Sequence, residues 1–161
     1  MIRKAQPDHL LPAARLAALL WPGHSLAELE TELAELTARP DAAVFLAWED
    51  NKAVGFAQCQ LRHDYVEGTA TSPVGYLEGI YVLEGHRHRG LARALLDACE
   101  DWARAMGCRE FASDCELTNG ESLRFHLGTG FTEANRIICF TKPLESPKQP
   151  NPRFTQETSS Q

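Results

Sequence analysis

The sequence contains no apolar run long enough to span a bilayer, for which a helix needs about 20 residues. The longest apolar stretches, such as residues 16–21, are much shorter than this. Residues 1–4 lead directly into polar sequence and lack the apolar stretch of a secretion signal. We therefore expect a cytoplasmic protein with no membrane partner.

Paired cysteines are also missing. The five cysteines are Cys59, Cys99, Cys108, Cys115 and Cys139, and no two of them have CxxC spacing. A disulfide framework or a structural zinc site would need paired spacing. We expect reduced thiols, most of them buried, and no metal ion. Cys115 is either close to a site or a small packing residue.

Basic residues are in the minority, because 16 Lys and Arg stand against 22 Asp and Glu and give a net charge of −6. A protein that neutralises phosphates along a nucleic acid needs a surplus of basic side chains, so we expect no nucleic-acid partner. An acidic cleft attracts cations, and the charge balance is therefore compatible with a polycationic amine as substrate. Acidic charge can also serve solubility alone.

The sequence has the size and composition of one globular domain, with 161 residues, 43% of them hydrophobic and 24% charged. Its elements indicate a mixed α+β sheet with helices on both faces. We assign residues 1–143 to this domain and expect residues 144–161, rich in polar residues and proline, to be a disordered tail. Periodicity and turn signals predict strands at 2–5, 42–49, 53–62, 74–82, 110–113 and 133–141, and helices at 7–20, 25–39, 91–106 and 120–127.

The segment from Arg87 to Ala92 joins a predicted strand to a predicted helix and has the features of an anion-binding loop. Gly90 and the small Ala92 allow a ligand to approach the backbone closely. The N–H groups at the start of the helix are unpaired, and the helix dipole favours an anion there. Arg87, Arg89 and Arg93 add positive charge. A pyrophosphate would fit this loop, and the alternative is an ordinary turn with solvated arginines.

The pattern Arg87-x-x-Gly90-x-Ala92 after a strand rich in Tyr, Ile and Val resembles the acetyl-CoA motif of the GNAT N-acetyltransferases. Asn119, followed by residues 125–126 and 130–131, resembles a second segment of that superfamily. Within the superfamily the chain is similar to the type I aminoglycoside 6′-N-acetyltransferases over about residues 1–143. The stretches that carry this likeness are residues 21–24, 62–66, 72–73, 77–82, 107–110 and 112–114.

The resemblance implies a GNAT fold, with a mixed sheet of about six to seven strands and helices on both faces. Two parallel middle strands, 74–82 and 110–113, would splay apart and admit the pantetheine arm of acetyl-CoA, while its pyrophosphate would rest on residues 87–92. The family also suggests a homodimer. The residues that the resemblance assigns to acetyl-CoA are Ile80, Tyr81, Val82, Arg87, His88, Arg89, Gly90, Leu91, Ala92, Arg93, Asn119 and His126.

The activity implied is transfer of an acetyl group to the 6′-amine of an aminoglycoside antibiotic, by direct attack in a ternary complex, giving resistance. Because such an amine is largely protonated near neutral pH, a carboxylate must hold it and accept its proton. Glu78 lies within a predicted central strand, where a charge is costly unless paired or used. Asp114 follows the next strand at its carboxyl end, where ligands bind in open α/β sheets. The resemblance makes both candidate bases; the alternatives are a structural salt bridge for Glu78 and a turn or cap for Asp114.

The resemblance also places Trp21, Tyr65 and Glu133 in the acceptor pocket, where aromatic rings pack on sugars and attract cations. The alternatives are helix-end packing for Trp21 and a surface position for Glu133. Most GNAT enzymes have a tyrosine as general acid for the thiolate, and this chain has His126 there. His126 could donate that proton. It could also be a packing residue, the thiolate then leaving unassisted.

Other functions compete with the aminoglycoside hypothesis. The acceptor could be a polyamine, an amino sugar or a protein N-terminus, or the chain could be a non-catalytic acyl-CoA-binding domain. The acidic pocket candidates favour a polycation over a peptide, and the presence of Glu78 and Asp114 argues against a non-catalytic domain.

Overall fold

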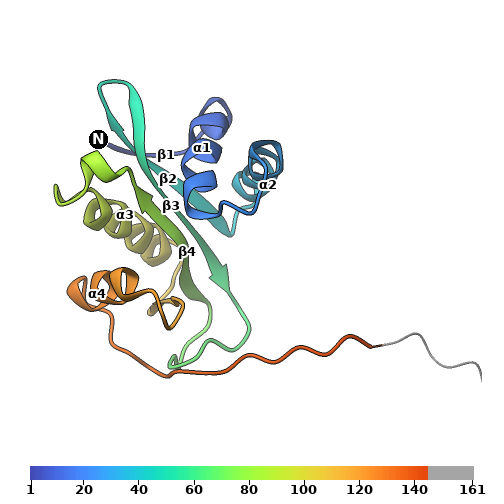
Figure 1. The fold of residues 1–161 in the computed structure, drawn as a ribbon. Helices are drawn as coiled ribbons and strands as arrows, with labels where there is room; N and C mark the ends of the chain where they lie inside the picture. The colour runs from blue at the N-terminus through green and yellow to red at the C-terminus, as the bar shows by residue number, and fades with distance from the viewer. Residues whose placement is uncertain (145–161) are drawn as a thin grey trace, which may run out of the picture.

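Five β-strands form one mixed sheet in the order β1-β2-β3-β4-β5 in the computed structural model, which describes residues 1–144 (Figure 1). The strands β1 to β4 are antiparallel to their neighbours, whereas β5 runs parallel to β4. This mixed sheet confirms the predicted fold class. The strands are β1 (Ile2–Lys4), β2 (Ala42–Glu49), β3 (Lys52–Arg62), β4 (Val74–Val82) and β5 (Phe111–Ser113).

Helices cover both faces of the sheet, as the sequence predicts (Figure 1). One face packs against α1 and α2 around the fully buried Phe56, and the other packs against α3 through Leu95 and Leu96. The helix α4 lies on the α3 side, where Phe125 contacts the same core. The helices are α1 (Leu10–Leu20), α2 (Leu26–Ala38), α3 (Leu91–Ala105) and α4 (Gly120–Gly128), with short 3-10 turns η1 (Pro7–His9) and η2 (Glu84–His86) before α1 and α3.

Local signals in the sequence account for several of these boundaries. Ser25 caps α2, since its hydroxyl accepts from the Glu28 N–H at 3.2 Å while the Glu28 carboxylate accepts from the Ser25 N–H at 2.8 Å. Asp50 and Asn51 turn the chain between β2 and β3 with φ of 46° and 61°. Two successive positive φ angles match the twist of a tight hairpin.

The pairing of β4 with β5 is short, because β5 ends at Ser113 while β4 continues to Val82. We call the point just after the Leu77–Ser113 pair the fork. Only Gly75, Tyr76 and Leu77 of β4 pair with β5, the last of them with Ser113. Beyond Leu77, β4 continues to Val82, and no strand of the described chain pairs with that edge. The backbone of this part of β4 is therefore available to an extended ligand on one side. Because β5 is the last strand in the order, the fork opens at the edge of the sheet and not at its middle.

The predicted strand at 133–141 is wrong for the described chain, and the sheet there has five strands, not six or seven. Residues 131–144 adopt no regular secondary structure. The side chains of Ile137, Ile138 and Phe140 are 68%, 81% and 87% exposed. A strand needs a neighbour that completes its hydrogen bonds, and no described strand lies in register with this segment.

Three further expectations extend beyond residues 1–144, the part of the chain that the structure describes. Within residues 1–144, no helix is both long and apolar enough to cross a membrane. In the same range, His, Cys, Asp and Glu side chains form no cluster that could hold a metal ion. The disordered tail predicted at 144–161 lies, apart from its first residue, outside the described residues.

Candidate active site

Glu78 is the extra residue of a β-bulge in β4. The register pairs Leu77 with Cys59 and Gly79 with Gln58, and so leaves no partner position on β3 for Glu78. A bulge kinks the strand and re-aims the side chain of the extra residue. It places the carboxylate of Glu78 at the fork, one residue after the last β4–β5 pair.

The carboxylate of Glu78 is held by two side chains of β3. Gln60 donates from Nε2 to Oε1 at 2.7 Å. Arg62 donates from Nε and Nη2 to the same oxygen at 3.1 and 2.8 Å, and from Nη2 to Oε2 at 3.0 Å. The Glu78 side chain is 20% exposed, so the ion pair with Arg62 offsets the cost of placing a charge there. The Oε2 atom of Glu78 accepts one hydrogen bond and can still accept a second.

Asp114 follows β5 and receives a hydrogen bond from the hydroxyl of Tyr76. Tyr76 is buried, with 6% of its surface exposed. Burial, and then the hydrogen bond to Asp114, raise the pKa of Tyr76 well above its usual range. Tyr76 therefore remains a hydrogen-bond donor to Asp114 at every physiological pH. Asp114 takes part in no ion pair with any of residues 1–144.

The guanidinium of Arg62 also lies over the ring of Tyr76, with Cζ 3.4 Å from the ring centroid. Arg62 thus binds Glu78 directly. It also contacts Tyr76, which in turn donates a hydrogen bond to Asp114. The two predicted carboxylates therefore belong to one connected set of side chains, namely Gln60, Arg62, Tyr76, Glu78 and Asp114.

His126 lies on α4 and contacts the last residue of β5. Its Nε2 is 2.8 Å from the Ser113 hydroxyl, and its Nδ1 donates to the Ser122 carbonyl at 2.7 Å. Ser113 also donates to the Leu77 carbonyl at 3.1 Å, across the final β4–β5 pair. The Ser113 hydroxyl therefore links His126 to the backbone of β4. His126 is thus fixed at the fork, and its role as a general acid stays a prediction.

The predicted anion-binding loop ends at a helix start that lacks a side-chain cap. Gly90 is the N-cap residue of α3 with φ of 79°, a left-handed conformation that glycine adopts without strain. No side chain within the described chain caps this end, whereas Ser25 and Asn119 cap α2 and α4. The first N–H groups of α3 therefore face outward unpaired and can bind an anion. This arrangement fits a pyrophosphate.

The arginines of this loop already have acidic partners. Arg87 donates from Nε to the Val82 carbonyl at 3.0 Å and from Nη1 to Glu121 at 3.1 Å. Arg89 lies 3.5 Å from Glu49, and the exposed Arg93 pairs with Asp97 at 3.3 Å. Exposed pairs of this kind are weak, so a bound phosphate could replace the carboxylates.

The other residues predicted to bind the coenzyme lie around the fork and the loop. Ile80, Leu91 and Ala92 are half-buried and contact the core beside α3. The guanidinium of Arg87 is 5.4 Å from the centroid of the Tyr81 ring, and the exposed His88 has φ of 60°. Asn119 accepts from the Ser122 N–H at 3.0 Å as the cap of α4. Coenzyme contacts for these residues remain predictions.

The three residues predicted to line the acceptor pocket differ in their surroundings. Trp21 packs over Gly79, where a Cβ atom would lie 2.6 Å from the Trp21 ring. Its ring also meets Phe56 edge-on at 5.8 Å, so Trp21 packs beside the bulge, and its place in an acceptor pocket stays a prediction. Tyr65 is 80% exposed. Glu133 is also exposed and pairs with Arg136.

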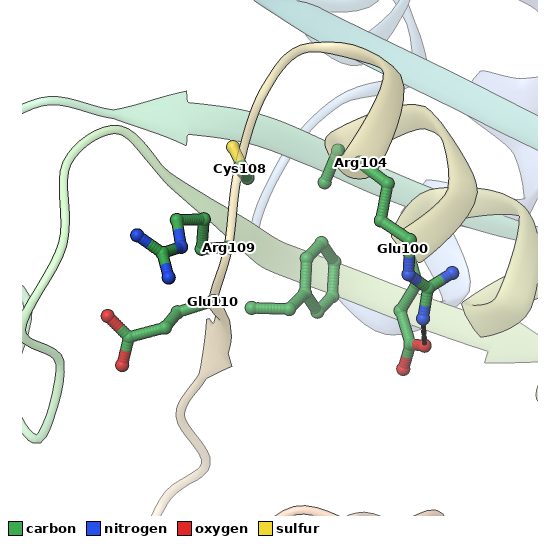
Figure 2. A pocket seen from close by; sticks show the side chains of 7 residues that line it. Glu100, Arg104, Cys108, Arg109 and Glu110 are labelled. Carbon is green, nitrogen blue, oxygen red and sulfur yellow. Dashed lines mark hydrogen bonds and ion pairs between the residues drawn. The ribbon is translucent and has the colours of Figure 1, made fainter.

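A pocket of about 210 Å³ lies elsewhere, between the end of α3 and the start of β5 (Figure 2). Figure 2 shows Arg104 joined to Glu100 across one side, with Cys108, Arg109 and Glu110 on the segment that leads into β5. None of the predicted site residues lines it. Because it lies at the opposite end of α3 from Gly90, we do not assign it to the predicted activity.

Sequence reasoning gave no role to Gln60, Arg62, Tyr76, Ser113 or Glu121. One signal was available for two of them: Gln60 and Arg62 are polar residues at alternate positions of a strand that is otherwise largely apolar. Their partner Glu78 lies 16 and 18 residues away in the sequence, so the pairing itself requires the register of the sheet.

Comparison with known proteins agrees with this geometry. The profile of the Acetyltransferase (GNAT) family matches residues 13–131. The chain belongs to this family. Within it, the aminoglycoside N(6′)-acetyltransferase type 1 of Stenotrophomonas maltophilia is 44% identical over 148 residues, which cover 89% of this chain and 94% of the relative. The resemblance inferred from the sequence motifs is therefore confirmed.

Solved structures of this GNAT group superpose closely on the chain. The aminoglycoside N-acetyltransferase AAC(6′)-Iy in complex with CoA matches with a TM-score of 0.87 at 40% identity, covering 89% of this chain and 95% of that structure. AAC(6′)-Iy in complex with the bisubstrate analogue CoA-S-monomethyl-acetylneamine matches with a TM-score of 0.86 at 40% identity, covering 89% and 98%. The chain is thus a GNAT acyltransferase in both sequence and fold.

Proposed function

We propose that this protein transfers an acetyl group from acetyl-CoA to the 6′-amine of aminoglycosides and so confers resistance to them. One observation carries the proposal. An uncapped helix start suited to a pyrophosphate lies at one end of the unpaired edge of β4, and two carboxylates lie at the other end of that edge. The relatives named for this activity cover nearly the whole of the described chain.

In this proposal the coenzyme supplies a thioester as the acetyl donor. The N–H groups at the start of α3, with Arg87, bind its pyrophosphate. The edge of β4 at residues 80–82, which pairs with no strand of the described chain, orients the pantetheine arm. Binding both substrates at one fork brings the amine and the thioester together, and this proximity supplies much of the rate enhancement.

The acceptor amine must lose a proton before it attacks. Glu78 and Asp114 are the candidates that hold the ammonium group and take its proton, directly or through water. Trp21 and Tyr65 line the acceptor side, with Glu133 adding negative charge. His126, held at the fork by Ser113, is the candidate that returns a proton to the leaving thiolate.

We further propose that residues 1–143 form the catalytic domain and that it works in the cytoplasm, where acetyl-CoA is available, as a homodimer. The exposed Ile137, Ile138 and Phe140 support a second copy as partner, because a contiguous apolar stretch of this kind is covered in most soluble proteins. Size-exclusion chromatography with light scattering tests this point. A monomer at micromolar concentration would contradict it.

The decisive experiment is a thiol-release assay with acetyl-CoA against kanamycin, spermidine and a panel of peptides. We expect release with kanamycin, and NMR of the product should place the acetyl group on the 6′-nitrogen. Acetylation of spermidine or peptides without kanamycin would replace the proposed substrate class. Coenzyme binding without turnover of any amine would indicate a non-catalytic domain.

A further inference from the structure

Arg62 is the structural link between the two candidate carboxylates. Its Nε and Nη2 make three hydrogen bonds to Glu78, and its Cζ lies 3.4 Å from the centroid of the Tyr76 ring. The hydroxyl of the same Tyr76 ring donates a hydrogen bond to Asp114. A shift of Glu78 would therefore disturb Arg62 directly, and a shift of Asp114 would disturb Tyr76, which contacts Arg62.

The two carboxylates differ in how much negative charge they offer to a substrate. Glu78 faces a guanidinium, so its charge is compensated within the protein, and four of its contacts are already made. Asp114 receives a hydrogen bond from a neutral phenol, which orients the carboxylate and leaves its charge intact. Asp114 is also exposed, whereas the Glu78 side chain is 20% exposed.

We propose that Arg62 is a positioning residue that divides the work between the two carboxylates. It holds Glu78 as a neutralised partner that orients the acceptor, and through Tyr76 it fixes Asp114 as the group that binds the ammonium ion and takes its proton. This inference rests on the proposed function and goes beyond it, because it names the base and the residue that sets the site's charge.

Replacing Arg62 by methionine keeps the bulk of the stem and removes the cation. Glu78 would then be uncompensated, so the site would attract a polycationic acceptor more strongly, and we expect the KM for kanamycin to fall several-fold. The same change removes the support of Tyr76, and we expect kcat to fall at least tenfold, because a small displacement of Asp114 impairs proton transfer far more than it weakens the attraction of its charge for the polycation. Loss of folded protein alone would lower kcat and leave KM unchanged.

Two companion variants isolate the charge. Arg62→Lys keeps the cation but loses the planar stacking and the two-pronged contact, so KM should return to the wild-type value while kcat stays reduced. In the double variant Arg62→Met with Glu78→Gln both charges are gone, and KM should again approach wild type. Arg39→Met is the matched control, because Arg39 contacts Asp41 through the same two nitrogens away from the site; its kinetics should not change.

Several results would overturn the proposal. A raised KM in Arg62→Met, or unchanged constants, would remove Arg62 from this role. Full activity in Asp114→Asn, with activity lost in Glu78→Gln, would make Glu78 the base.

Wild-type protein that acetylates no aminoglycoside would disprove the proposed function, and a second measurement then still tests the link. Arg62 and Asp114 share no direct contact, so the shifts that Arg62→Met and Asp114→Asn cause in the urea midpoint should be non-additive only while Tyr76 is present. Additive shifts both in the Tyr76 background and in the Tyr76→Phe background would show that no link exists.

Discussion

Arg87 donates from Nη1 to the carboxylate of Glu121, 3.1 Å away, and so joins the loop after β4 to the first turn of α4. The same guanidinium is the one that the proposed function assigns to the pyrophosphate. Glu121 and the coenzyme therefore compete for one cation. The Glu121 side chain is 70% exposed, which limits the strength of the protein's own pair.

Glu121→Gln should bind CoA more tightly, because Arg87 no longer has to leave an acidic partner. An exposed pair contributes at most about 1 kcal/mol, so the gain should stay below about fivefold. Isothermal titration calorimetry at low and high salt measures it, and the difference should shrink as salt increases. Glu100→Gln, which removes one of the two acidic partners of Arg104 far from the loop, is the control and should change nothing. Weaker CoA binding in Glu121→Gln would mean that Glu121 holds Arg87 in its binding position.

Gly90→Ala should destabilise the fold and weaken coenzyme binding together. A Cβ at Gly90 would meet no atom within 4 Å in the described chain, so the cost comes from φ of 79° alone. That cost is about 1–2 kcal/mol for a residue with a side chain. Urea unfolding reports the stability and calorimetry with CoA reports the binding. Gly85→Ala, in the 3-10 turn η2 just before the loop, has equal space and no positive φ, and equal losses in both variants would contradict this explanation.

Glu110 should make the loop at 63–73 sensitive to acid. Its carboxylate accepts from the Thr71 hydroxyl and from the N–H groups of Thr71 and Ala70 at 2.5, 2.7 and 2.9 Å. The bond from the Thr71 hydroxyl, followed by the backbone bonds, lowers the pKa of Glu110 below its ordinary value of 4.5. A lowered folded-state pKa means that the stabilisation is complete above about 4.5 and is lost as the pH falls through the lower value. Amide exchange of Ala70 and Thr71 should then accelerate relative to the intrinsic exchange rate at the same pH, so that their protection factors fall.

The variant Glu110→Gln tests whether the acid sensitivity of the loop at 63–73 originates from Glu110. The amide oxygen can still accept hydrogen bonds but does not titrate near pH 4, so exchange at the two amides should be faster at neutral pH and should lose its extra acceleration in acid. An unchanged acid profile in this variant would assign the effect to another carboxylate.

Asp114→Asn should lower the pKa of Tyr76, although only in part. Burial is the largest cause of the raised pKa and the hydrogen bond to Asp114 comes second, so burial still raises the pKa after the carboxylate is gone. Absorbance of tyrosinate during an alkaline titration follows the change, and Tyr76→Phe identifies the signal among the three tyrosines. If Tyr76 titrates identically with and without Asp114, the phenol and the carboxylate are not in contact in solution.

Helix starts and the anion-binding loop were predictable, because each depends on a few neighbouring residues. Contacts between residues of different strands were not predictable. Ser25 with Glu28 predicts the start of α2, and the glycine and arginines around Gly90 predict an anion site, because each depends on a few consecutive residues. The ion pair of Arg62 with Glu78 depends on the register of β3 with β4 and on a bulge that no local pattern marks. The apolar pattern at 133–141 suggested a strand, yet a strand also requires a partner edge.

The bulge at Glu78 has a consequence for engineering acceptor specificity. Residues 74–77 and 79–82 pair with consecutive residues of β3, and β4 carries one residue more than β3 between these two segments. Substituting Glu78 changes one side chain, whereas deleting it would remove the bulge itself: Ile80 and Val82 would keep their β3 partners and still face the α3 core, but the kink beside the fork would be lost. Libraries that redesign this strand should therefore vary the residue types and retain the bulge, because the bulge aims the side chain at position 78.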